Sequence, residues 1–415
     1  IIHDESKIVT NLICFEKMKD FHFYAPTEMA FGRTSENELV GLIKKYTAGV
    51  TPKVLVHYGG SSAKRSGLLD RSLAALDAAG IAHVELGGVQ PNPRLSLVEE
   101  GVALCRREGL NFILAIGGGS VIDSAKAIGY GVCYDGPVWD LWIGKAAPKA
   151  VLPLGCIVTL PAAGSEMSDC SVITNEETQQ KLGLSSDLAR AKFAIMNPEL
   201  TMTLPWYQTA CGAVDIMMHT MERYFTKDTD MLVHTAMSEA LLRTVRLSAD
   251  ALKEKPDDYQ HRAAMMWASS WAHNDLTGSR NTADFATHKM EHEVSALFDV
   301  AHGAGLAALW PSWARYVMEE DVNRFVDFAV KVMDVTPDPE NPRLTAEKGI
   351  QAMEKCYLHW GMPINLPQLL GRKVTDEEIK LMATKCTKND TFAPGYFKPL
   401  KCNDVEAIFN LANKD

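Results

Sequence analysis

The sequence predicts a protein of two domains, an α/β domain with a parallel sheet followed by an all-helical domain. Its 415 residues exceed what a single hydrophobic core ordinarily holds. The first half alternates short apolar runs with amphipathic stretches, whereas the second half has helical patterns only. We therefore expect an α/β domain over residues 18–200 and an all-helical domain over residues 201–415. Residues 1–17 fit neither pattern, because charged residues interrupt their apolar ones, and we interpret them as an extension upstream of the fold.

The elements of the first half follow from the length and the period of its apolar segments. Short apolar runs predict strands, and the stretches between them have the spacing of helices that bury one face. The predicted strands are 53–58, 82–86, 111–116, 156–160 and 192–196, and the predicted helices are 68–79, 94–108 and 121–128. Nearly continuous apolar strands between amphipathic helices are typical of a parallel sheet that is covered on both faces.

After Asn197 and Pro198 the pattern becomes helical. Thr203 can cap a helix that has Pro205 in its first turn. From there to about residue 331, the sequence predicts long helices rich in Ala, Met, Leu and Trp. Residues 334–345 contain three prolines together with Asp and Asn, which predicts a loop before the helices resume.

The composition of the chain indicates in which cellular compartment the protein works and which classes of partner it does not bind. The net charge of −10, without a basic cluster, argues against a nucleic-acid partner and an anionic membrane surface. No segment approaches the roughly 18 apolar residues of a membrane span. The nine cysteines are scattered and never form a C-x-x-C pair, which favours reduced thiols. These features predict a cytoplasmic protein with neither a membrane nor a nucleic-acid partner.

A glycine-rich turn follows the predicted strand 111–116. Gly117, Gly118, Gly119 and Ser120 lead into a helix that contains Asp123. Glycines let the backbone approach a phosphate, and the free N–H groups of a helix start favour an anion. The run differs from the G-x-G-x-x-G fingerprint, and an ordinary tight turn would look the same. Its place at a strand end favours a Rossmann-like dinucleotide site, because ligands of such sheets bind there.

Two further turns follow predicted strands and could line the same crevice. One contains Thr159, Leu160 and Ser165. The other has serines, Lys64 and Arg65 but no acid, and each alone could be an ordinary surface turn. An acid at such a strand end would bind the ribose hydroxyls and disfavour a 2′-phosphate. The sequence therefore favours NADP(H) over NAD(H), with expected contacts at Gly59, Gly60, Ser61, Ser62 and Lys64.

The helical half contains a candidate metal centre. Asp215 and His219 lie four residues apart among apolar neighbours, so they share one face of a buried helix, where an unpaired carboxylate is costly. His288 and His292 share a face of a second helix, and His302 follows. One carboxylate and several imidazoles are donors that Fe²⁺ and Zn²⁺ both accept. Each residue alone could be an ordinary core or surface residue, and spacing leaves open which histidines bind.

At these segments the sequence resembles the iron-containing (group III) alcohol dehydrogenase family, from about Phe21 to near the C-terminus. Within the family it is most similar to butanol dehydrogenases and NADPH-dependent aldehyde reductases, a likeness found in Gly59–Lys64 and Pro91–Pro93. The resemblance implies a dinucleotide-binding domain, a helical domain, a metal in the cleft between them, and a homodimer.

The resemblance also implies roles for individual residues. It assigns Asp215, His219, His288 and His302 to the metal and places His292 near the nicotinamide, where it is a candidate proton relay. Further expected cofactor contacts are Asn92, Gly118, Gly119, Ser120, Asp123, Thr159, Ser165 and Lys181.

We therefore predict a metal-dependent, NAD(P)H-linked alcohol dehydrogenase or aldehyde reductase that acts on short aliphatic substrates by hydride transfer. A rival function is that of a metal- and NAD-dependent lyase of the dehydroquinate synthase type. Its substrate should require several basic residues near the metal, and segment 263–310 has only Arg280 and Lys289. A second rival is a metal-dependent hydrolase, which needs a general base beside water and no nicotinamide. A third is a binding protein with a structural metal.

Overall fold

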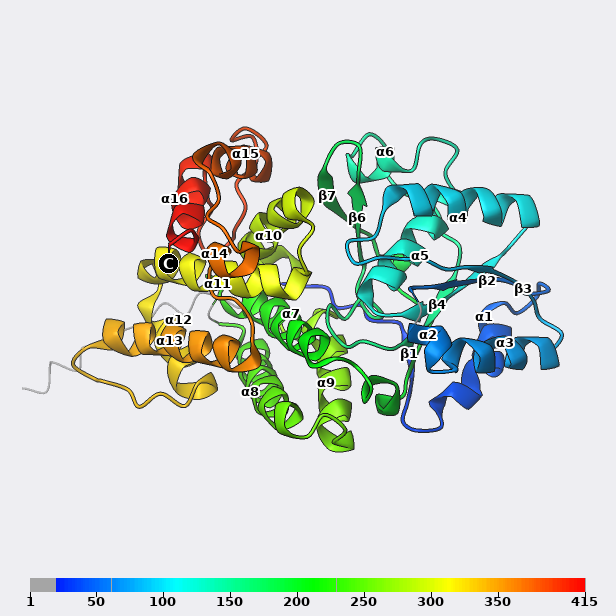
Figure 1. Ribbon diagram of the computed structural model, residues 1–415, viewed down its shortest axis with the longest axis horizontal. Helices are drawn as coiled ribbons and strands as arrows, with labels where there is room; N and C mark the ends of the chain where they lie inside the picture. The colour runs from blue at the N-terminus through cyan, green and yellow to red at the C-terminus, as the bar shows by residue number, and fades with distance from the viewer. Residues whose placement is uncertain (1–19, 61, 229, 415) are drawn as a thin grey trace, which may run out of the picture.

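The computed structural model describes residues 20–60, 62–228 and 230–414, so the expected extension over residues 1–17 lies outside the described part. An α/β half and a helical half lie side by side (Figure 1). The predicted fold class is confirmed. The division into independent domains at residue 200 stays a prediction.

The α/β half is built on six parallel strands in the order β1-β8-β5-β4-β2-β3. The central strands are buried on both faces, as their apolar sequences predict. The strand β1 at the edge was not predicted. The bounds are Glu28–Phe31 for β1, Lys53–Tyr58 for β2, Ala82–Leu86 for β3, Phe112–Gly117 for β4, Leu154–Val158 for β5 and Phe193–Met196 for β8.

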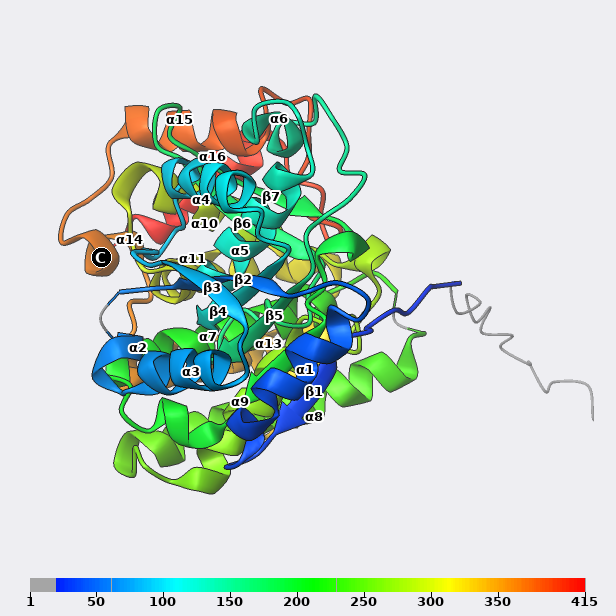
Figure 2. The same ribbon diagram turned by 90° about the vertical axis from the view of Figure 1, so that its right-hand side faces the viewer.

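Helices cover both faces of this sheet (Figure 2). On one face Val56, Leu114 and Ile195 pack against α1 and α3. On the other face Leu55 and Ile113 pack against α4 and α5. The helices of this half are α1 Leu39–Tyr46, α2 Ser62–Arg65, α3 Leu68–Ala78, α4 Leu95–Glu108, α5 Gly119–Val132 and α6 Trp139–Trp142.

His57 is a buried histidine in the centre of this half. Its Nδ1 lies 2.8 Å from the carbonyl oxygen of Leu86, and its Nε2 lies 2.9 Å from the hydroxyl of Ser124. Burial lowers the pKa of His57 to about 4, so the folded protein keeps the ring neutral.

The low pKa of His57 predicts a loss of stability in acid. Below pH ~6.5 the unfolded chain takes up a proton that the folded chain does not accept until about pH 4. The contribution of His57 to stability is therefore complete above pH ~6.5 and falls by roughly 1.4 kcal/mol per pH unit toward pH 4. Urea unfolding with a chelator present, from pH 7 to 4, should show a shallower decline for His57→Asn than for the unchanged chain. Equal declines would contradict this explanation.

A two-stranded antiparallel hairpin leaves the main sheet and was not predicted. It consists of β6 Cys170–Asn175 and β7 Gln180–Ser185. Its strands mix polar and apolar residues, because the hairpin packs on α5 and reaches α10 (Ala286–Phe298) of the helical half. The hairpin thereby carries Lys181 toward the helical half.

The helical half differs from the prediction at two helix starts. Pro205 precedes the first turn of α7 as its N-cap residue, so Thr203 does not cap this helix. Pro342 is the first residue of α13 and Asn341 caps it, so the predicted loop ends before residue 342 and not at 345. Proline fits a first helical position because no N–H is needed there. The helices are α7 Trp206–Tyr224, α8 Leu232–Glu254, α9 Tyr259–Ala272, α10 Ala286–Phe298, α11 His302–Val317, α12 Val322–Asp327, α13 Pro342–Trp360, α14 Leu366–Leu370, α15 Asp376–Cys386 and α16 Cys402–Ala412.

The helix α7 lies in the core of this half. Its residues from Gly212 to Tyr224 are all buried, and α8, α9 and α11 pack around it. The aromatic rings of Phe225, Trp310 and Phe325 form part of the same core. None of the helices in the described ranges is both long and apolar enough to cross a membrane.

Candidate active site

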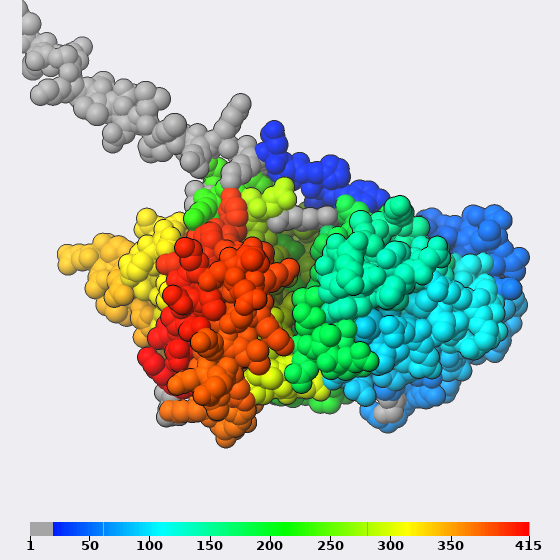
Figure 3. All heavy atoms as spheres, turned by 90° about the horizontal axis from the view of Figure 1, so that it is seen from above, coloured from blue at the N-terminus to red at the C-terminus, as the bar shows by residue number. Residues whose placement is uncertain are grey.

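A cavity of about 790 Å³ lies where the carboxyl ends of β2, β4 and β5 face the helical half. In the space-filling view the surface is hollowed between the two halves (Figure 3). Because β2 and β4 are neighbours whose connections leave in opposite directions, this position is the switch point at which α/β sheets bind ligands.

The glycine turn after β4 forms one wall of the cavity. Gly117, Gly118 and Gly119 line it, and α5 begins at Gly119. A Cβ on Gly118 would lie 3.0 Å from the Cβ of Leu160, so glycine lets this turn pack against the loop after β5. The helix α5 begins at this wall, and the first N–H groups of a helix have no partner within the helix, so this end of α5 favours an anion in the cavity. Ser120, Thr159 and Leu160, which are predicted cofactor contacts, line the same wall.

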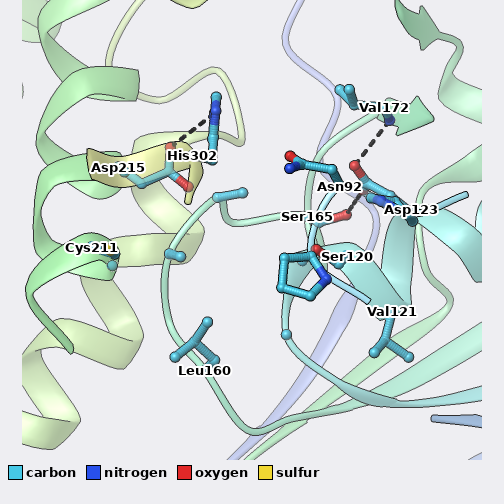
Figure 4. Close-up of a pocket in the computed structure, with 18 of the residues that line it drawn as sticks. Asn92, Ser120, Val121, Asp123, Leu160, Ser165, Val172, Cys211, Asp215 and His302 are labelled. Atoms are coloured by element: carbon cyan, nitrogen blue, oxygen red, sulfur yellow. Dashed lines mark hydrogen bonds and ion pairs between the residues drawn. The ribbon is translucent and has the colours of Figure 1, made fainter. Parts of the chain in front are cut away.

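Asp123 and Ser165 form the base of this wall. The Ser165 hydroxyl donates to Asp123 Oδ1 at 2.5 Å, and the backbone N–H of Val172 donates to Oδ2 at 2.9 Å (Figure 4). Burial raises the pKa of Asp123, although the nearby Lys126 ammonium opposes that effect. Asp123 lines the cavity and ties α5 to the loop after β5 and to β6.

The loop after β2 contributes fewer residues to the cavity than expected. Gly59 and Ser62 line it, whereas Gly60 and Lys64 are not among its lining residues. The Lys64 ammonium lies 5.3 Å from the centre of the Tyr58 ring. The predicted contact Ser61 lies outside the described residues.

Asn92 also lines the cavity, but its side chain is bonded to the helical half. Its Nδ2 donates to Asp299 Oδ1 at 3.0 Å and to the carbonyl oxygen of Val300 at 3.2 Å. The backbone of Asn92 is left-handed, with φ at 55°, a conformation that asparagine tolerates better than most residues.

The four candidate metal ligands lie together on the opposite wall of the cavity. They come from α7, from α10 and from the first residue of α11. Asp215 Oδ1 lies 3.4 Å from His219 Nε2, 3.8 Å from His288 Nε2 and 3.8 Å from His302 Nε2. Asp215 and His302 point toward each other across the cavity edge (Figure 4).

Two donor atoms of this cluster are buried and have no hydrogen-bond partner among the described residues. Within the described ranges, Asp215 Oδ1 and His288 Nε2 have no hydrogen-bond partner. Buried polar atoms without partners are rare, and a divalent cation among these atoms would satisfy both. One carboxylate oxygen and three imidazole nitrogens suit Fe²⁺ and Zn²⁺ alike.

Buried carboxylates orient two of the histidines. His288 Nδ1 lies 3.1 Å from Glu222 Oε1, and His302 Nδ1 is bonded to Glu291. In both rings Nδ1 is hydrogen-bonded to the carboxylate, so Nε2 is the nitrogen that faces the cluster. Burial lowers the pKa of His219 well below its usual value, and the neighbouring imidazoles act in the same direction. That ring is therefore neutral, as a metal ligand must be.

Two further histidines lie beside the cluster. His292 lines the cavity one turn after His288, with its ring centre 5.9 Å from that of His302. Burial lowers the pKa of His292 well below its usual value. His273 was not predicted at the site, yet its ring stacks on His219 with centres 4.0 Å apart, and its Nδ1 lies 2.7 Å from the carbonyl oxygen of Ala163. No local sequence pattern marks His273, because it follows the end of α9 and reaches the site only through tertiary packing.

A glycine turn at the switch point of a parallel sheet faces a carboxylate and three imidazoles, so the cavity combines the features of a nucleotide site with those of a metal centre, as a metal-dependent dehydrogenase requires. The chain belongs to the iron-containing alcohol dehydrogenase family. Residues 26–198 match the family model described as iron-containing alcohol dehydrogenase, and residues 209–413 match its C-terminal region.

Individual relatives agree with this assignment. The chain is 39% identical to NADH-dependent butanol dehydrogenase A of Clostridium acetobutylicum over 94% of this chain and 99% of that protein. It is 33% identical to the NADPH-dependent aldehyde reductase YqhD of Escherichia coli over 84% of this chain and 89% of that protein. The crystal structure of NADH-dependent butanol dehydrogenase A from Thermotoga maritima superposes with a TM-score of 0.90 and 36% identity, over 96% of this chain and 99% of that one.

The predicted enzyme class, an NAD(P)-dependent alcohol dehydrogenase of the iron-containing type, is thereby confirmed. Family membership favours this class over the lyase, the hydrolase and the binding protein.

Proposed function

We propose that the enzyme transfers hydride between NAD(P)H and short aliphatic aldehydes or alcohols at one divalent cation, Fe²⁺ or Zn²⁺. In this proposal Asp215, His219, His288 and His302 hold the cation. The supporting observation is the convergence of three Nε2 atoms on Asp215 Oδ1, on the wall opposite the glycine turn.

The residues of the chain have separate roles in this reaction. When bound, the cation would polarise the substrate oxygen and the nicotinamide would supply the hydride. The turn Gly117–Gly119 and the start of α5 would hold the pyrophosphate of the cofactor. His292 faces the cavity as a neutral imidazole, and it accepts or returns the hydroxyl proton at a ring nitrogen.

The proposed substrate class rests on the cavity wall and on the relatives. Several apolar side chains line the cavity, and a short alkyl chain would displace water from them. The relatives are named as butanol dehydrogenases and an aldehyde reductase. The apolar lining residues include Leu160, Ala162, Leu204, Cys211 and Phe285.

The proposal is tested by purifying the enzyme without oxygen, measuring its metals, and assaying aldehydes from ethanal to hexanal with each nicotinamide cofactor. We expect about one Fe²⁺ or Zn²⁺ per chain and the fastest reduction among the short unbranched aldehydes. Protein without bound cation that nevertheless reduces these aldehydes would refute the metal centre, and turnover confined to other substrate classes would refute the substrate assignment.

We propose further that the enzyme prefers NADP(H). The loop after β2 supports this preference, because its described residues have Ser62 and Lys64 but no acid. The relatives differ, since the butanol dehydrogenases are named NADH-dependent and the aldehyde reductase NADPH-dependent.

Replacing Lys64 by alanine tests this preference. We expect kcat/KM for NADPH to fall roughly tenfold, about the loss of one charge-assisted contact to the 2′-phosphate. The value for NADH should stay within about twofold, because NADH lacks that phosphate. Equal effects on both cofactors, or a higher kcat/KM for NADH in the unchanged enzyme, would contradict the preference.

We also propose a homodimer that works in the cytoplasm. The eight cysteines of the described residues are free thiols, which suits a reducing compartment. Light scattering during gel filtration should give twice the mass of the chain, and a monomer mass would contradict the dimer.

A further inference from the structure

His302 differs from the other three proposed ligands in its position and exposure. Asp215, His219 and His288 lie inside helices, and their side chains are 5–6% exposed. His302 is the first residue of α11, and its side chain is 26% exposed. The helix and the surrounding side chains therefore restrict the His302 ring less than they restrict the other ligands. A contact with another residue is needed to fix its orientation.

Glu291 is that anchor. Its side chain is fully buried, and its carboxylate bonds to His302 Nδ1 and to the Ser295 hydroxyl. Gly305 on α11 makes room for it, because a Cβ there would lie 2.9 Å from both Cγ and Oε1 of Glu291.

The positive charge that balances the Glu291 carboxylate is the ammonium group of Lys181, which comes from the α/β half. Lys181 lies in β7, and its Nζ is 3.2 Å from Glu291 Oε2 and 3.4 Å from His302 Nδ1. The side chains of this ion pair are 5% and 0% exposed. A buried carboxylate that loses its partner is strongly destabilised, so Glu291 depends on Lys181. The analogous pair of His288 with Glu222 lies wholly within the helical half.

A second contact from the α/β half holds the segment just before His302. Arg94 Nη2 donates to Asp299 Oδ2 at 2.8 Å, and Asn92 donates to Asp299 and to Val300. The α/β half therefore touches this ligand both at its ring, through Lys181 and Glu291, and at its preceding backbone.

We propose that Lys181 and Glu291 are positioning residues for His302, through which contact between the two halves determines how tightly the metal is held. The inference rests on the proposed metal centre. It gives Lys181 a role in metal binding, distinct from the cofactor contact that family resemblance implies.

Titration of the metal-free enzyme with Co²⁺, followed by its visible ligand-field spectrum, tests the proposal without measuring turnover. Loss of an outer carboxylate that orients a ligand histidine typically weakens metal binding roughly 10- to 100-fold. We expect a loss in this range for Glu291→Gln and about tenfold for Lys181→Met, which keeps the length of the side chain but removes its charge. The spectrum of bound Co²⁺ should change in both variants, because the His302 ring is no longer fixed.

Lys385→Met is the matched control. Lys385 also bridges the halves, donating from α15 to the carbonyl oxygen of Gln179 at 3.1 Å in the turn of the same hairpin, but this contact is exposed and touches no proposed ligand. The Lys385→Met variant should bind Co²⁺ as tightly as the unchanged enzyme does. If Glu291→Gln fails to fold, Gly305→Ala provides the second variant, because it displaces Glu291 and keeps its charge.

Two results separate the possible failures. If the unchanged enzyme binds no Co²⁺, the proposed metal centre fails and this inference fails with it. If the unchanged enzyme binds Co²⁺ and Lys181→Met binds it equally well with an unaltered spectrum, only the positioning role is overturned. A weaker affinity of Lys181→Met for NADPH alone would then assign Lys181 to the cofactor.

Discussion

Replacing His288 by alanine should remove the bound cation and lower aldehyde reduction by roughly 10³-fold. A cation that polarises the substrate oxygen supplies several kcal/mol of transition-state stabilisation, and each ~1.4 kcal/mol is a factor of ten in rate. His288 is buried inside α10, and its Nε2 has no other partner among the described residues. Alanine also leaves Glu222 Oε1 without the ring it orients. Metal analysis of protein purified without oxygen and NADPH oxidation with butanal measure the two effects.

His261→Ala is the control for this substitution. His261 lies in α9, where its Nδ1 is 3.2 Å from the Ser248 hydroxyl, and it is not among the cavity-lining residues. This variant should keep its metal and its turnover within about twofold of the unchanged enzyme, as substitutions away from such sites usually do. Full metal content and turnover in His288→Ala would remove His288 from the ligand set.

Replacing Gly118 by valine should weaken cofactor binding at least roughly 30-fold while the metal content stays unchanged. The Cβ would meet the Cβ of Leu160 at 3.0 Å, and the two methyl groups would occupy the space beside the start of α5. A phosphate that can no longer approach these N–H groups loses a set of charge-assisted hydrogen bonds, worth ~2 kcal/mol or more. Fluorescence titration with NADPH and metal analysis of the same sample separate the two sites.

Gly41→Val controls for the general cost of adding valine. Gly41 lies on the exposed side of α1, and a Cβ there meets nothing within 4 Å. Its cofactor affinity should not change. If Gly118→Val bound NADPH as tightly as Gly41→Val does, the pyrophosphate would bind elsewhere.

The sequence alone predicted the parallel sheet and the helical half because their patterns are local. Apolar runs such as β4 Phe112–Gly117 reflect burial on both faces, and the buried pair Asp215 and His219 reflects the helical period. The edge strand β1 was missed because it has four residues, of which only Ala30 is buried. The hairpin β6–β7 was missed because its two strands mix polar with apolar residues.

Contacts between distant segments had to come from the tertiary structure. The stacking of His273 on His219, the bonds of Asn92 to Asp299 and Val300, and the pairing of Lys181 with Glu291 all join parts of the chain that no periodic pattern relates. The presence of a carboxylate and several histidines in buried helices was therefore determined by the sequence itself. The tertiary structure alone brings these side chains to one point and places residues of the α/β half beside His302. Both results depend on how α7, α10, α11 and the hairpin pack together, and the spacing of residues within each element does not determine that packing.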